Sequence, residues 1–124
     1  MRLGTVGALL AGLGVGAGAF GAHGLRDRLD PASMATFETA VRYQMIHGLA
    51  VLIAAQRSGH TPGPAARNAG IFFTAGIVLF SGSLYALALG APRAVGVITP
   101  FGGLSFLVGW ALLALSFAGA PQPH

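Results

Sequence analysis

The chain has 124 residues, enough for one domain, and only 8% of them are charged while 54% are hydrophobic. An average soluble domain carries about 25% charged residues, so a soluble fold of this composition could not cover its surface with polar groups. The charge deficit and a mean hydropathy of +0.72 together exclude an ordinary soluble protein and indicate one embedded in a lipid bilayer.

The basic isoelectric point of about 11.3 has a different origin from that of a nucleic-acid-binding protein. There is no lysine, and the arginines are scattered between apolar segments: Arg2, Arg26, Arg28, Arg42, Arg57, Arg67 and Arg93. Binding to nucleic acid requires a contiguous basic surface that releases counterions from several phosphates. We therefore expect no nucleic-acid partner, and we interpret the arginines as residues that flank membrane segments. The absence of cysteine excludes disulfides, thiolate metal sites and a cysteine nucleophile.

The first apolar segment, residues 3–22, has no charged side chain. As a helix it would be about 30 Å long, which matches the hydrocarbon core of a bilayer. A signal peptide is the rival interpretation, because Arg2 precedes the segment and residues 17–19 resemble a cleavage site. The apolar segments that follow favour a retained membrane helix.

The second segment, residues 31–56, is polar in its first half and apolar in its second half apart from His47. Asp30 is suited to cap this helix, and Pro31 to occupy its first position. A helix of this length, about 39 Å, exceeds the hydrocarbon core, so it must tilt or extend past it. If it lay at the interface instead, the number of spans would be odd.

The third segment, residues 69–90, is free of charge, and the fourth, residues 99–119, starts at Thr99 and Pro100 as N-cap and first helical residue. Trp110 lies inside this last segment and not at its edge. The connections are too short to hold a soluble domain, and the proline-rich tail, residues 120–124, is expected to fray. We predict an all-α integral membrane protein, a single domain with a bundle of four transmembrane helices at about residues 3–22, 31–56, 69–90 and 99–119.

Glycine is abundant, with 20 copies, and several copies recur at intervals of four residues. Such spacing places small residues on one helix face and lets two helices approach closely, which matters in lipid because no hydrophobic force drives helices together there. The first segment carries two of these rows, which suggests neighbours on both sides. The favoured interpretation is packing within the bundle, and the alternative is a dimer interface. The glycines expected at helix contacts are Gly12, Gly14, Gly16, Gly18, Gly82 and Gly109.

Polar residues in and near the second segment form the candidate functional cluster: Glu38, Arg42, Tyr43, Gln44, His47 and His23. Glu38 and Arg42 are four residues apart, so we expect them to pair on one face. Ionisable groups within a membrane segment are costly and usually face the bundle or a water-filled cavity, so we expect His47 to be buried between helices. His47 would then handle protons or a polar ligand, or it would serve with Gln44 as hydrogen-bonding glue between helices, which is the favoured interpretation.

A pair of histidines also raises the question of a metal or haem held between His23 and His47. No carboxylate or thiol joins them at metal-ligand spacing, and there is no haem-attachment motif, so we expect no metal and no cofactor. Motifs of nucleophile elbows, P-loops and dinucleotide-binding sites are likewise missing. An enzymatic role is therefore not favoured.

Particular strings carry a resemblance over nearly the whole chain. They are residues 18–25 (GAFGAHGL), residues 39–50 (TAVRYQMIHGLA), residues 80–85 (FSGSLY), residues 98–103 (ITPFGG) and the pair Gly109 and Trp110. In this order they resemble the domain of unknown function 423 family of small bacterial inner-membrane proteins, whose eukaryotic relatives are called transmembrane protein 256. The resemblance implies four helices and a membrane location, and it brings no established reaction.

The favoured function is a non-enzymatic structural or accessory component of the membrane. The alternative is a small transporter or channel that uses the polar half of the second helix. Water reaching His47 would favour transport, and a dry, packed centre would favour the structural role. The expected partners are the lipid bilayer and either a second copy of the chain or a larger membrane complex.

An even number of spans would place both termini on one side of a bacterial inner membrane. The arginine count hardly chooses the side, since Arg2, Arg57 and Arg67 oppose a similar number at the other end. The N-terminal amine beside Arg2, and the usual dominance of the first helix, favour termini in the cytoplasm.

Overall fold

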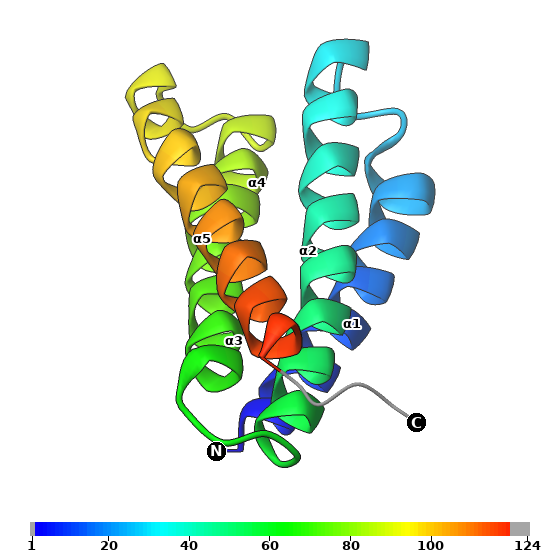
Figure 1. Cartoon of the computed structure of the whole chain (residues 1–124). Helices are drawn as coiled ribbons and strands as arrows, with labels where there is room; N and C mark the ends of the chain where they lie inside the picture. The colour runs from blue at the N-terminus through cyan, green and yellow to red at the C-terminus, as the bar shows by residue number, and fades with distance from the viewer. Residues whose placement is uncertain (1, 120–124) are drawn as a thin grey trace.

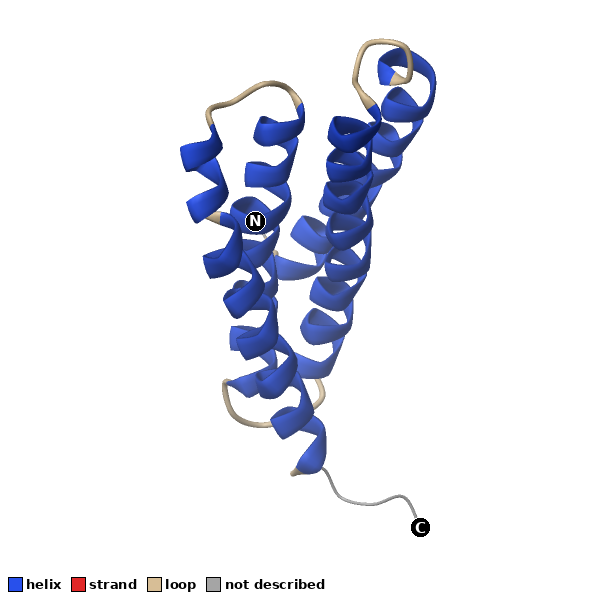
Figure 2. Ribbon diagram, turned by 90° about the horizontal axis from the view of Figure 1, so that it is seen from above, coloured by secondary structure: helices blue, strands red, loops and turns tan. Residues whose placement is uncertain are grey.

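A computed structural model describes residues 2–119, and within this range the chain is helical, with no strand. The predicted all-α class is thereby confirmed. The helices alternate in direction along the bundle (Figure 1), and loops join their ends (Figure 2). The elements are α1 (Leu3–Phe20), the π-helical η1 (Gly21–Leu25), α2 (Pro31–Ser58), α3 (Ala65–Gly76), the π-helical η2 (Ile77–Ser81), α4 (Gly82–Ala88), the 3₁₀ helix η3 (Arg93–Val97) and α5 (Thr99–Ala118).

Within the described residues, 3 helical stretches are long and apolar enough to cross a membrane: Leu3–Leu25, Ala65–Ala88 and Arg93–Ala118. The first is α1 continued by η1, the second is α3, η2 and α4 in one rod, and the third is η3 with α5. The 28-residue α2 is absent from this set. Its N-terminal half carries the polar side chains that lower its mean hydropathy.

Helix starts follow the predicted capping chemistry in one place and depart from it in another. Asp30 caps α2, because its carboxylate accepts a hydrogen bond of 2.7 Å from the Ser33 amide, and Pro31 follows in the first turn. The expected Thr99 cap is wrong: its side chain caps no backbone amide, and its hydroxyl lies 2.6 Å from that of Ser83. The reason is that η3 runs almost directly into α5, so Ile98 at the N-cap position is already helical.

The rod that begins with α3 starts at Ala65, before the expected residue 69. Arg67 and Asn68 lie in its first turn, where polar side chains reach solvent and do not interrupt a helix. At its other end α4 stops in a glycine turn, with Gly90 at a φ of +106° and the Ala91 amide bonded to the Ala86 carbonyl at 2.9 Å. Only glycine takes this left-handed conformation without steric cost.

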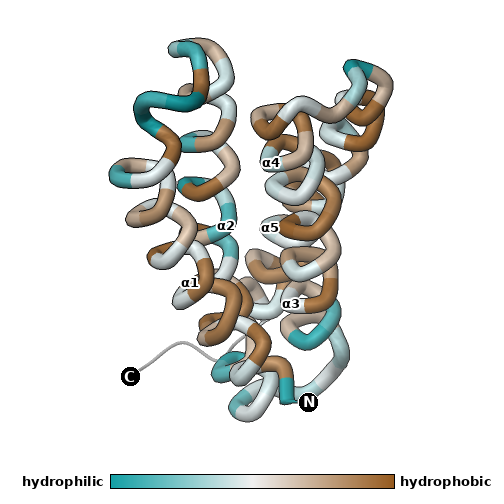
Figure 3. The backbone as a smooth tube through the Cα atoms, turned by 180° about the vertical axis from the view of Figure 1, so that it is seen from behind, coloured by the Kyte–Doolittle hydropathy of each residue, from teal (hydrophilic) through white to brown (hydrophobic). Residues whose placement is uncertain are grey.

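The helices form two pairs, α1 with α2 and the α3–α4 rod with α5, and most contacts between the pairs are made by α2 (Figures 1 and 3). The buried core between the pairs combines alanines with larger apolar side chains: Ala50, Val51, Ala54, Ala69, Phe73, Ile77, Phe106 and Leu113. Alanine on both α2 and α3 lets these helices approach closely. Hydrophilic residues gather at the two ends of the bundle and along part of α2 (Figure 3).

The two glycine rows of α1 face opposite ways. A Cβ on Gly14 would lie 2.6 Å from the Met45 side chain, and one on Gly18 would lie 3.3 Å from Val41, so this row packs on α2. Nothing lies within 4 Å of such an atom on Gly12 or Gly16. At 100° per residue the rows point about 200° apart, and α1 stands at the edge of the bundle, so one row must face outward.

The expectation of packing within the bundle therefore fails for Gly12, Gly16 and also Gly82, which likewise has open space around it. Gly109 does pack inward, because a Cβ there would lie 2.7 Å from the ring of Phe73.

Candidate functional site

His47 lies on α2 at the centre of the bundle and is 4% exposed. Trp110 of α5 donates its indole N–H to Nε2 of His47 over 3.1 Å, and Nδ1 lies 2.8 Å from the Tyr43 carbonyl. An indole nitrogen can only donate and a carbonyl can only accept, so Nε2 is the acceptor and Nδ1 carries the proton. Both contacts agree on one neutral tautomer, and together they hold the ring in place. The prediction that His47 is buried between helices is confirmed.

Aromatic rings enclose this imidazole. We call the group the His47 layer: His47, Tyr43, Phe73, Phe80, Phe106 and Trp110. The ring of Phe106 stacks on that of His47 with centroids 3.6 Å apart and planes 12° apart, and Phe73 meets Trp110 edge-on at 4.8 Å. His47 lines none of four well-formed cavities in residues 2–119. The imidazole is therefore packed and already has its partners, while Tyr43 and Trp110 at the edge of the layer are 36% and 41% exposed.

Gln44, one residue after Tyr43, joins α2 to two further elements. Its amide nitrogen donates to the Leu10 carbonyl of α1 over 2.8 Å, and its amide oxygen accepts from the Tyr85 hydroxyl of α4 over 2.6 Å. Both ends of the buried amide are thus satisfied, which removes the cost of placing it in an apolar interior. The bonds tie α2 to a helix on each side.

Hydroxyl groups make similar links elsewhere in the bundle. Ser81 donates to the Ala40 carbonyl over 2.8 Å, and Ser105 donates to the Phe72 carbonyl over 2.7 Å. Serine is small enough to let helices approach while it bonds a neighbouring backbone. These serines, with Tyr85 and Trp110, were absent from the predicted cluster. The position of Trp110 inside an apolar segment, away from the interface where tryptophan is usually enriched, was the available signal.

Glu38 and Arg42 lie apart from the His47 layer, exposed on the side of α2 that faces the end of α1. They line a groove of about 380 Å³ with Gly18, Met34 and neighbouring residues. No ion pair joins them within the described part of the chain, so the expected interaction is wrong. Exposed charges gain little from pairing, because solvation competes and two long side chains must be ordered, so the median contribution is about 0–1 kcal/mol.

His23 is exposed in η1 and is not part of the His47 layer. Since both ring nitrogens of His47 are already hydrogen-bonded, the two histidines share no site that would hold haem or a metal. Among the described residues, no group of three or more His, Cys, Asp or Glu side chains could hold a metal ion. The structure therefore separates the predicted cluster into a buried part, His47 with Gln44, and an exposed part.

Residues 17–103 match a family model described as "Protein of unknown function (DUF423)". A UPF0382 membrane protein of Staphylococcus epidermidis is 50% identical over 117 residues, which cover 92% of this chain and 95% of that protein. The UPF0382 membrane protein YwdK of Bacillus subtilis is 40% identical over 115 residues, covering 92% and 91% respectively. No solved structure matches the chain. The family match, these relatives and the long apolar helices identify the chain as a membrane protein that belongs to the DUF423 family.

Proposed function

We propose that this protein is a structural or accessory component of the bacterial inner membrane and that its interior carries out no chemistry. The observation that carries the proposal is the state of His47. Its two ring nitrogens are bonded to Tyr43 and Trp110, and an aromatic ring lies against its face. A proton or ligand could reach the imidazole only after these contacts broke.

The proposal includes α2 as a fourth span. At 1.5 Å per residue its 28 residues extend about 42 Å, enough to cross the core with its polar end in the headgroup region. Buried residues occur along most of the helix, from Phe37 to Ala54. The start of α1 and the end of α5 lie at the same end of the bundle, as an even number of spans requires (Figure 1).

If the interior carries out no chemistry, the function of this protein depends on contacts made by its outer surface. The row of Gly12 and Gly16 is open to the outside, and the flanking Leu9 and Leu13 are 51% and 64% exposed. A flat apolar face of small residues allows a helix of another molecule to approach closely. We assign this face of α1 to contact with a second copy of the chain or with a larger membrane complex.

Transport would need a path for water to His47. The hydrogen bonds and the stacked ring that surround the imidazole argue against such a path. Flux of protons and small cations across proteoliposomes tests this point. We expect the same flux with and without the protein. A flux that His47→Phe abolishes would overturn the structural role.

The outer contact is tested by crosslinking in native membranes. Leucine at both Gly12 and Gly16 would fill the open face without disturbing the fold, so we expect crosslinked species to be lost. Gly82→Leu is the matched control, because Gly82 is also open but lies on α4. Crosslinking that survives the double substitution would place the contact elsewhere.

A further inference from the structure

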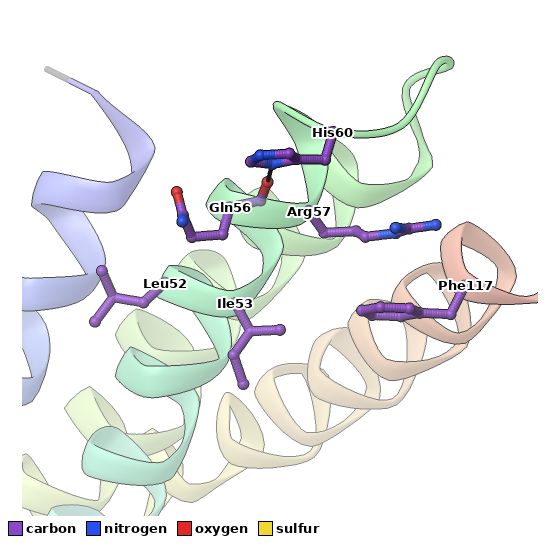
Figure 4. Close-up of a pocket in the computed structure, with 6 residues that line it drawn as sticks. All are labelled: Leu52, Ile53, Gln56, Arg57, His60 and Phe117. Atoms are coloured by element: carbon purple, nitrogen blue, oxygen red, sulfur yellow. Dashed lines mark hydrogen bonds between the residues drawn. The ribbon is translucent and has the colours of Figure 1, made fainter. Parts of the chain in front are cut away.

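A pocket of about 410 Å³ lies between the C-terminal ends of α2 and α5, away from the His47 layer. Its lining consists of Leu52, Ile53, Gln56, Arg57, His60 and Phe117. Figure 4 shows Leu52 and Ile53 on the bundle side, and Arg57 reaching toward Phe117 at the end of α5. The pocket thus combines an apolar wall with polar nitrogen groups, at the end of the bundle where α2 and α5 terminate.

Arg57 spans the pocket from α2 to α5 (Figure 4). It donates from Nη2 to the Ser116 carbonyl over 2.8 Å, and its guanidinium carbon lies 4.4 Å from the centre of the Phe117 ring. These contacts hold the cation in place at the carbonyl end of α5, where a positive charge is favourable. Its buried Nε finds no acceptor among the described residues. Arg57 is therefore ordered by the protein while its donors remain incompletely used.

Among residues 2–119, the charged side chains near the pocket are all positive. Arg2, Arg57 and Arg67 lie at this end of the bundle, whereas Asp27, Asp30 and Glu38 belong to the loop after η1 and the start of α2, at the opposite end. Within residues 2–119 no carboxylate is available to neutralise Arg57. A site with this charge and an apolar wall is complementary to an anion attached to a hydrocarbon chain.

We propose that this pocket binds an anionic phospholipid, with its phosphate at Arg57 and an acyl chain along Leu52, Ile53 and Phe117. Guanidinium matches phosphate in both charge and donor geometry. Gln56 also lines the pocket, but its amide points away from the Arg57 guanidinium (Figure 4), so the phosphate contact is assigned to Arg57. The apolar wall favours a phospholipid over free phosphate, because only the phospholipid has an acyl chain to place against it.

The test is lipid retention by the full chain in a neutral detergent, measured by native mass spectrometry. Phosphatidylglycerol is compared with phosphatidylcholine of the same acyl chains. We expect retention of the anionic lipid to exceed that of the zwitterionic lipid by roughly fivefold or more. Equal retention of the two lipids would overturn the proposal.

Ile53→Trp fills the pocket without changing any charge. Its matched control is Ile46→Trp, because Ile46 lies two turns away on the same face of α2 and is 47% exposed against 48% for Ile53. We expect Ile53→Trp to reduce retention of phosphatidylglycerol about tenfold and Ile46→Trp to leave it unchanged. An equal effect of the two substitutions, or none, would show that lipid binds the surface nonspecifically.

Arg57→Gln tests the headgroup contact, with Arg67→Gln as its control, since Arg67 is exposed at the same end but lines a different cavity. Only Arg57→Gln should abolish the preference for the anionic lipid.

Inorganic phosphate tests whether the ligand is a lipid headgroup or a free anion. We expect it to raise the melting temperature less than phosphatidylglycerol does, because it lacks an acyl chain, and an equal rise would identify a free anion as the ligand.

Discussion

The hydrogen bond between Trp110 and His47 determines how the central imidazole behaves. Because Trp110 can only donate, it stabilises the neutral tautomer and opposes protonation at Nε2. A neutral ring suits this interior, where the ring nitrogens of His47 bond a carbonyl and an indole N–H rather than a carboxylate among residues 2–119. The same contact links α5 to α2, so one bond serves both electrostatics and packing.

Trp110→Phe tests this contact, because it removes the indole donor and leaves Nε2 of His47 unpaired. We expect the free energy of unfolding in detergent to fall by about 1 kcal/mol. Adding His47→Phe should cost less than the sum of the two single changes, since a buried pair removed together leaves no unsatisfied atom. Strict additivity in this double-mutant cycle would mean that the bond contributes nothing to stability.

Asp30 gives the start of α2 a dependence on pH. Its carboxylate accepts the Ser33 amide hydrogen bond, which holds its pKa below the ordinary value of 3.8. A depressed pKa means that the stabilisation is complete above the ordinary value and is lost as pH falls through the lowered one. We expect the Ser33 amide resonance to follow this titration in NMR spectra.

The control for this titration is Asp30→Asn, which can still cap the helix but does not ionise. The acid transition of the Ser33 resonance should disappear in that variant. A transition that persists unchanged would belong to another group.

At the scale of single elements, the contact between α1 and α2 depends on where the glycines lie and not on how many there are. A Cβ on Gly7 would lie 2.8 Å from the Gly48 carbonyl and 2.9 Å from the Leu52 amide, so the backbones of α1 and α2 meet there. Backbone atoms cannot rotate away as side chains do. Contact between α1 and α2 therefore depends on Gly7 and on the inward row, while the outward row is free for other partners.

Alanine substitution separates these two kinds of glycine. Gly7→Ala should destabilise the bundle by about 1–3 kcal/mol through overpacking against backbone. Gly12→Ala should be neutral or stabilising by up to about 1 kcal/mol, because the new methyl has space and alanine favours the helix. Thermal unfolding in detergent compares them, and equal effects would contradict the packing described for α1.

At the scale of the whole molecule, the proposed even number of spans fixes the relation between the two ends of the chain. Reporter fusions at Arg2 and after His124 should give the same signal, and a protease added outside intact spheroplasts should leave a tag after His124 uncut. The second expectation rests on the arginine distribution.

His124 lies outside the described residues, so the tag reports only the side reached by the end of α5. Opposite fusion signals would show that α2 does not cross, and external cleavage would reverse the orientation.

Sequence alone determined the features that depend on neighbouring residues. Low charge and high hydropathy indicate a membrane protein, and Asp30 with Pro31 marks the start of α2, because solvation and capping act within a few residues. The cost of an ionisable group in a membrane segment predicted the burial of His47, but its bond to Trp110 joins positions 63 residues apart. The tertiary structure alone decided that bond, the absence of a Glu38–Arg42 pair and the outward direction of Gly12 and Gly16. Each depends on how one helix is rotated and shifted against another, and that is set by packing between distant segments, which no local pattern encodes.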